Sequence, residues 1–160
     1  MFNVFRALEF LGLSVWLGSD IFLSFVAAPG AFRVLAPNRD QAGAVVGFLL
    51  TKMHLIGIAC GVAVLLLRLL RTKAFASAIV APVALCLMLM IALTAVSQLT
   101  VTPKMAALRM RMGSIEETTA DSPLLTRFAK LHQISVSLEG GVLLVGTACM
   151  YLMVRELDRS

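Results

Sequence analysis

Four long apolar runs dominate this sequence of 160 residues and constrain its fold more than any other feature. We expect them to form helices at about residues 4–28, 44–70, 75–101 and 123–156. An α-helix rises about 1.5 Å per residue, so about 20 apolar residues cross a hydrocarbon core of about 30 Å. Lipid offers the backbone no hydrogen-bond partner, which favours helices. The sequence therefore predicts a single domain, 1–160: an all-α, multi-pass membrane protein folded as an antiparallel four-helix bundle.

Composition and charge also indicate that this chain lies in a lipid bilayer. Hydrophobic residues make up 59% of the sequence and charged residues 14%, against about 25% charged residues in soluble domains. The net charge of +5 favours contact with anionic lipid head groups over nucleic acid. No phosphate-binding loop or nucleophile elbow is present, so an enzyme is not favoured. Basic residues are nearly balanced between the two ends, so the positive-inside rule leaves the orientation open.

Residues 102–130 form the longest link between the expected helices. Met105, Leu108 and Met112 fall at helical spacing after Pro103, which predicts a short amphipathic helix between helices three and four. This helix would either lie on the membrane surface or pack over the end of the bundle. Further on, the pair Ser122-Pro123 predicts the capped start of the fourth helix.

Ionisable residues inside the apolar runs are the main functional candidates, because charge at membrane depth is costly. They are Glu9 and Asp20 in the first run, His54 in the second and Glu139 in the fourth, with His132 just before the fourth. Glu9 lies near an edge, where its side chain is expected to reach toward water. The other residues become candidates for one buried site.

Counting residues from the nearest basic residue at a membrane edge gives the depth of each candidate. Asp20 and His54 lie about 21 Å from that edge and Glu139 about 24 Å. His132 lies about 10 Å further along its helix. We therefore expect three helices to bring Asp20, His54 and Glu139 to one level, which the remaining helix passes near Thr94.

Softer polar and aromatic residues share the faces or levels of these candidates. The supporting residues are Trp16, Thr94, Ser97, Gln98 and Ser135. His54 also shares a face with Gly57 and Gly61, a spacing that permits close helix contact. Because so short a chain leaves much helix surface uncovered, we further expect a homo-oligomer or partners in a membrane complex.

Imidazole and carboxylate groups together suit a transition-metal ion. We predict a metal-handling membrane protein for transport or homeostasis, with Asp20, His54, Glu139 and His132 as ligands. A haem-binding redox protein is an alternative, although the depths of the two histidines differ by about 14 Å. Two further alternatives are a proton relay and a structural or assembly subunit whose polar groups serve only packing.

Short motifs of apolar, glycine, proline and polar residues follow one another along nearly the whole chain. They are Trp16-Leu17-Gly18, Phe25–Pro29, Phe32–Leu35, Met53-His54 with Gly57, Val96–Gln98, Thr102–Met105, and Arg127-Phe128 through His132 to Ser135. In this order they resemble the transmembrane-protein-205-like family, and more distantly copper-resistance protein D and haem-associated membrane proteins. The resemblance implies a four-helix membrane fold, and its motifs include His54, Gln98 and His132. Asp20 and Glu139 rest on depth alone.

Overall fold

The computed structural model of the protein describes residues 2–36, 38–71 and 81–158. Its helices include two π-helical segments, η1 and η2. In chain order the helices are α1 (Phe2–Phe22), η1 (Leu23–Ala27), α2 (Ala28–Val34), α3 (Arg39–Arg71), α5 (Pro82–Val96), η2 (Ser97–Val101), α6 (Thr102–Met112) and α7 (Pro123–Asp158).

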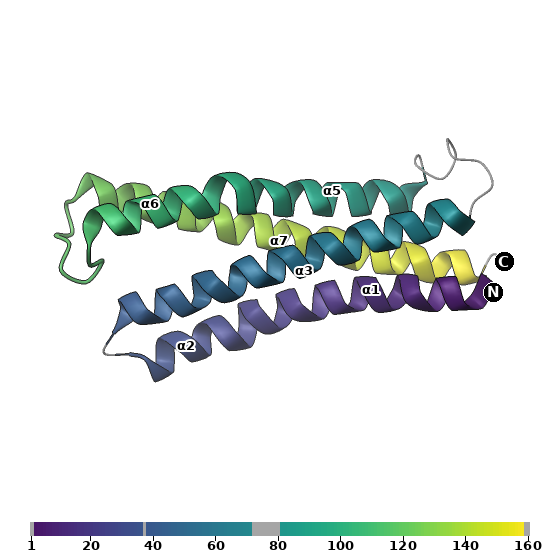
Figure 1. The fold of residues 1–160 in the computed structure, drawn as a ribbon, viewed down its shortest axis with the longest axis horizontal. Coiled ribbons are helices and arrows are strands. Elements are labelled where there is room, and N and C mark those ends of the chain that lie inside the picture. The colour runs from purple at the N-terminus through teal and green to yellow at the C-terminus, as the bar shows by residue number, and fades with distance from the viewer. Residues whose placement is uncertain (1, 37, 72–80, 159–160) are drawn as a thin grey trace.

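These helices form four membrane-spanning rods. Four stretches are long and apolar enough to cross a bilayer: Val4–Val34, Arg39–Arg71, Pro82–Met112 and Pro123–Asp158. The two chain ends lie at one end of the bundle and the turns after α2 and α6 at the other, as four antiparallel crossings require (Figure 1). The prediction of an all-α, four-helix membrane bundle is confirmed.

The rods extend beyond the expected ranges at the end of the bundle far from the chain termini. The first continues past residue 28 to Val34, and the second begins at Arg39, before residue 44. The expected start of the third helix near residue 75, and most of the short link between the expected helices 44–70 and 75–101, lie outside the described residues.

The short helix expected between the third and fourth helices is α6, and it is continuous with the third rod rather than separate. It follows η2 without a break and packs against α7, where the Arg109 guanidinium lies 5.7 Å from the centre of the Phe128 ring. It therefore lies alongside α7 within the bundle and not as a separate helix on the membrane surface. Gly113 ends α6 with a φ of 72°, a conformation that glycine adopts without strain.

Side chains cap the helices next to this turn. The Ser122 hydroxyl oxygen accepts a hydrogen bond from the Leu124 N–H at 3.3 Å, so Ser122-Pro123 begins α7 as predicted. On the facing helix α3, the Asp40 carboxylate accepts hydrogen bonds from the Ser114 hydroxyl at 2.7 Å and the Ile115 N–H at 3.0 Å. The α6–α7 turn is thereby fastened to the start of α3.

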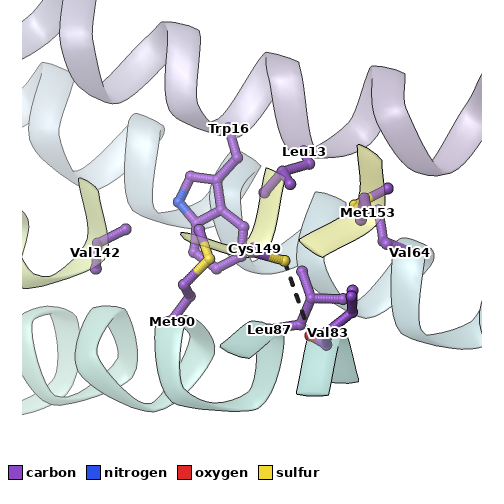
Figure 2. Packing of buried hydrophobic residues seen from close by; sticks show 9 residues of the cluster. All are labelled: Leu13, Trp16, Val64, Val83, Leu87, Met90, Val142, Cys149 and Met153. Atoms are coloured by element: carbon purple, nitrogen blue, oxygen red, sulfur yellow. Dashed lines mark hydrogen bonds between the residues drawn. The ribbon is translucent and has the colours of Figure 1, made fainter. Parts of the chain in front are cut away.

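The apolar core lies between the four rods in the half of the bundle nearer the chain termini (Figure 2). Its members are Leu13, Trp16, Val64, Val83, Leu87, Met90, Val142, Cys149 and Met153. Trp16 is fully buried and lies against Gly57 and Gly61, where a β-carbon would overlap the indole ring. The glycine face of α3 is therefore used within this chain, to bring α1 close to α3.

A charge cluster of Glu9, Arg68, Arg71 and Glu156, largely buried except at Glu156, whose side chain is 37% exposed, holds the terminal end of the bundle together. Arg68 donates to Glu9 at 3.2 Å and to Glu156 at 2.8 Å, and Arg71 donates to Glu9 at 3.1 Å. Glu9 is only 1% exposed, so it does not reach into water as the sequence suggested. Because the partners come from α1, α3 and α7, the cluster joins three of the four rods.

Candidate intramembrane His–Glu site

His54 is the centre of a buried polar site at membrane depth. Its side chain is fully buried in the middle of α3, where its face turns inward with Gly57 and Gly61. The Nδ1 atom lies 2.8 Å from Gln98 Oε1, and the Nε2 atom lies 2.7 Å from Glu139 Oε1. Both ring nitrogens are therefore engaged, one by η2 and one by α7.

The hydrogen-bond pattern fixes where a proton must lie. A carbonyl oxygen only accepts, so Nδ1 carries a hydrogen that it donates to Gln98. One further proton then lies between His54 Nε2 and Glu139 Oε1, either on the carboxyl group or on the ring. The Ser97 hydroxyl donates to the same Glu139 oxygen at 3.1 Å and so stabilises its negative charge.

Asp20 is the second buried carboxyl group at this level. It is fully buried on α1, and the Ser24 hydroxyl donates to its Oδ1 atom at 3.3 Å. Asp20 is near enough to Glu139 and His54 to interact electrostatically with both, although no hydrogen bond joins them. The structure thus places Asp20, His54 and Glu139 in one region from three helices.

The other residues singled out from the sequence divide into buried and exposed positions. Trp16, Thr94 and Ser135 are buried on the inner faces of α1, α5 and α7. His132 is exposed, two helical turns before Glu139 on α7, so its imidazole does not join the buried site. Of the two ligands predicted on α7, only Glu139 is therefore buried.

Two π-helical turns adjoin the site, and they were not predicted from the sequence. η2 carries Ser97 and Gln98, and η1 begins three residues after Asp20. In both segments the capping N–H reaches five residues back, to the oxygen of Leu23 or Ser97. Such turns occur often at functional sites, because the wider turn changes the direction of the side chains that follow.

Proline explains where these turns form. Pro29 and Pro103 each lie two residues after a π-helical segment. A proline ring collides with the carbonyl four residues earlier in a regular α-helix, and widening the preceding turn relieves that contact. At η2 the Thr102 hydroxyl also donates to the Ser97 oxygen at 3.0 Å. A proline near the end of each of these two helical runs, Pro29 and Pro103, is the sequence signal that could have revealed the two turns.

The arrangement does not contain a preformed metal centre within the part of the chain that the structure describes. No group of three or more His, Cys, Asp or Glu side chains there is arranged to hold a metal ion. A His54 nitrogen would have to give up its hydrogen bond to Glu139 or Gln98 before it could bind a metal. What the geometry offers directly is acid–base chemistry in a buried environment.

The fold and this site define an integral membrane protein: a four-helix bundle with a hydrogen-bonded His–Glu pair inside the membrane. Residues 11–114 match the family model described as domain of unknown function DUF4149, and the chain belongs to that family. No curated protein and no solved structure was found to match the chain. The comparisons name neither the transmembrane-protein-205-like family nor copper-resistance protein D, so that resemblance stays a prediction.

Proposed function

We propose that this protein is a proton-handling membrane protein in which His54 and Glu139 bind and release a proton inside the bilayer. The observation that carries the proposal is the 2.7 Å contact between His54 Nε2 and Glu139 Oε1, with His54 fully buried. Ionisable residues inside a membrane are characteristic of proton relays. The pair holds one proton between a carboxyl group and an imidazole in a buried environment.

The neighbouring groups support this role. Gln98 orients the imidazole by accepting from Nδ1, so Nε2 always faces Glu139. Ser97 donates to the carboxylate and supports its ionised form. Both come from η2, a helical turn whose hydrogen bonding differs from that of the helix around it. A change of η2 to regular α-helix would turn both side chains, which gives the pair a structural means of changing its proton affinity.

Replacing Glu139 with Gln tests the proposal. In liposomes containing a pH-sensitive dye, the wild-type protein should acidify the interior when a potassium diffusion potential drives protons inward. We expect Glu139→Gln to reduce this flux at least about tenfold, because a positioned proton-transfer group accounts for effects of roughly 10²–10⁴-fold. Infrared difference spectra should also lose the carboxyl band of residue 139.

Glu117→Gln is the matched control, since it removes the same charge from an exposed position in the α6–α7 turn. That variant should retain wild-type flux. Equal flux in the wild type, in both variants and in empty liposomes would remove the proposal. If the protein instead co-purifies with fixed membrane partners and conducts no protons, a structural or assembly role is the better account.

A transition-metal ion is the second candidate for the same site. Asp20 Oδ2 and Glu139 Oε2 are buried without a hydrogen-bond partner, and carboxylate oxygens with an imidazole suit such an ion. Elemental analysis of protein purified without chelators should then find stoichiometric metal, which His54→Ala abolishes. Loss of metal from His132→Ala as well would extend the ligand set to that exposed residue. Absence of metal from the wild type removes this candidate.

Haem ligation by two histidines is less well supported by the geometry. His54 is buried with both nitrogens engaged, whereas His132 is exposed and lies about 10 Å along α7 from Glu139, the partner of His54. A Soret band in the purified protein would favour haem bound through one histidine and another ligand.

A further inference from the structure

Four buried polar atoms in the middle of the bundle have no hydrogen-bond partner among the described residues. They are Trp16 Nε1, Asp20 Oδ2, Thr94 Oγ1 and Glu139 Oε2. The first three side chains are at most 1% exposed and Glu139 is 8% exposed. Buried polar groups in native proteins almost always have partners, and leaving one unpaired is unfavourable. Four such atoms in one bundle therefore indicate a bound polar species.

One of the four atoms belongs to Glu139 itself, and the other three lie on helices that line the His54–Glu139 pair. Trp16 and Asp20 lie one turn apart on the inner face of α1, and the indole nitrogen lies against Gly57, one turn after His54. Thr94 precedes Ser97 by one turn on the third rod, and Ser97 donates to Glu139. Figure 2 shows the Trp16 nitrogen at the edge of the ring that faces away from Leu13 and Met153. That edge faces the half of the bundle that contains the polar site.

The chemistry of these atoms selects the species. The indole N–H only donates, so it requires an acceptor. A bare metal cation offers none, whereas a water oxygen does. The free carboxyl oxygens of Asp20 and Glu139 accept, and the Thr94 hydroxyl can do either. A water molecule accepts two hydrogen bonds and donates two, and buried waters usually make about three.

We propose that Trp16, Asp20, Thr94 and Glu139 bind a buried water molecule that connects Asp20 to the His54–Glu139 pair. This rests on the proposed proton-handling function and makes Asp20 the next proton-transfer group. In each step the Asp20 carboxyl gives its proton to the water oxygen, and the water gives a different proton to the Glu139 carboxylate. One O–H bond forms for each that breaks, and the water is regenerated.

Asp20→Asn and Trp16→Phe test this water-mediated path. Asp20→Asn should lower proton flux into dye-loaded liposomes at least about tenfold while leaving the infrared carboxyl band of Glu139 in place. Trp16→Phe keeps a buried six-membered ring and removes the five-membered ring that carries the N–H donor. In this variant the infrared O–H stretch of the bound water, identified by its shift in H₂¹⁸O, should disappear. Proton flux should also slow. Ser14→Ala is the control, because Ser14 lies on the same helix at an exposed position.

The outcomes separate the two proposals. Wild-type flux in Asp20→Asn, with flux abolished in Glu139→Gln, would overturn the water-mediated path and leave the His54–Glu139 pair standing. Wild-type flux in both variants would overturn both proposals. If Asp20→Asn does not fold, Trp16→Phe and Thr94→Val decide, and an unchanged ¹⁸O-sensitive band in both would overturn the water site.

Discussion

Arg68→Ala is expected to lower the free energy of unfolding by about 3 kcal/mol, because it breaks a buried ion pair. Arg68 is 6% exposed and donates to both Glu9 and Glu156, which belong to two other rods. Its loss leaves Glu9 buried with part of its pairing gone. Arg71 still donates to Glu9, which keeps the expected cost at the lower end of the range for buried pairs.

The measurement is unfolding in mixed micelles of increasing SDS fraction, followed by circular dichroism. Arg155→Ala is the matched control, since Arg155 is exposed near the same end of the bundle and contacts only the Tyr151 ring among the described interactions. Its unfolding midpoint should stay near wild type. A similar midpoint for Arg68→Ala would mean that the buried charge cluster contributes little net stability. Proton flux should persist in folded Arg68→Ala, because the cluster lies far from His54.

Much of the fold was accessible from the sequence because lipid imposes a simple rule on length and polarity. The four apolar runs predicted the four rods, and their ends could be placed to within a few turns. Counting along each helix also predicted that Asp20, His54 and Glu139 share a level. A helix has a constant rise, so depth is readable from residue number alone.

Helix rotation and local helix geometry were not accessible in this way. Glu9 was expected to reach into water, yet it faces Arg68 and Arg71 from another rod, and only packing sets which faces meet. His132 was predicted as a ligand about 10 Å along the helix from Glu139, yet only Glu139 is enclosed by neighbouring helices. The π-helical turn at Ser97–Val101 shifts the register of the third rod and so places Ser97 and Gln98 at the site.

Trp16→Ala is the second substitution with a large expected effect on stability. Removing a fully buried tryptophan leaves a cavity between α1 and α3, at a cost of roughly 3–5 kcal/mol. Dispersion contacts dominate packing between helices in a membrane, so the lost contacts with Gly57 and Gly61 are the main cause. The same SDS titration should show a midpoint well below that of Trp16→Phe, which retains most of the ring.

Gly57→Leu provides the complementary change in a double-mutant cycle. Alone it should also destabilise the protein, because any side chain at this position overlaps the indole ring. Combined with Trp16→Ala, the leucine enters the space that the indole leaves, so the double variant should be more stable than the sum of the two single effects. Additive effects would show that Trp16 and Gly57 do not share one packing site. The cycle measures the contribution of Trp16 packing to stability, whereas the proton flux of folded Trp16→Phe measures the contribution of the indole N–H donor.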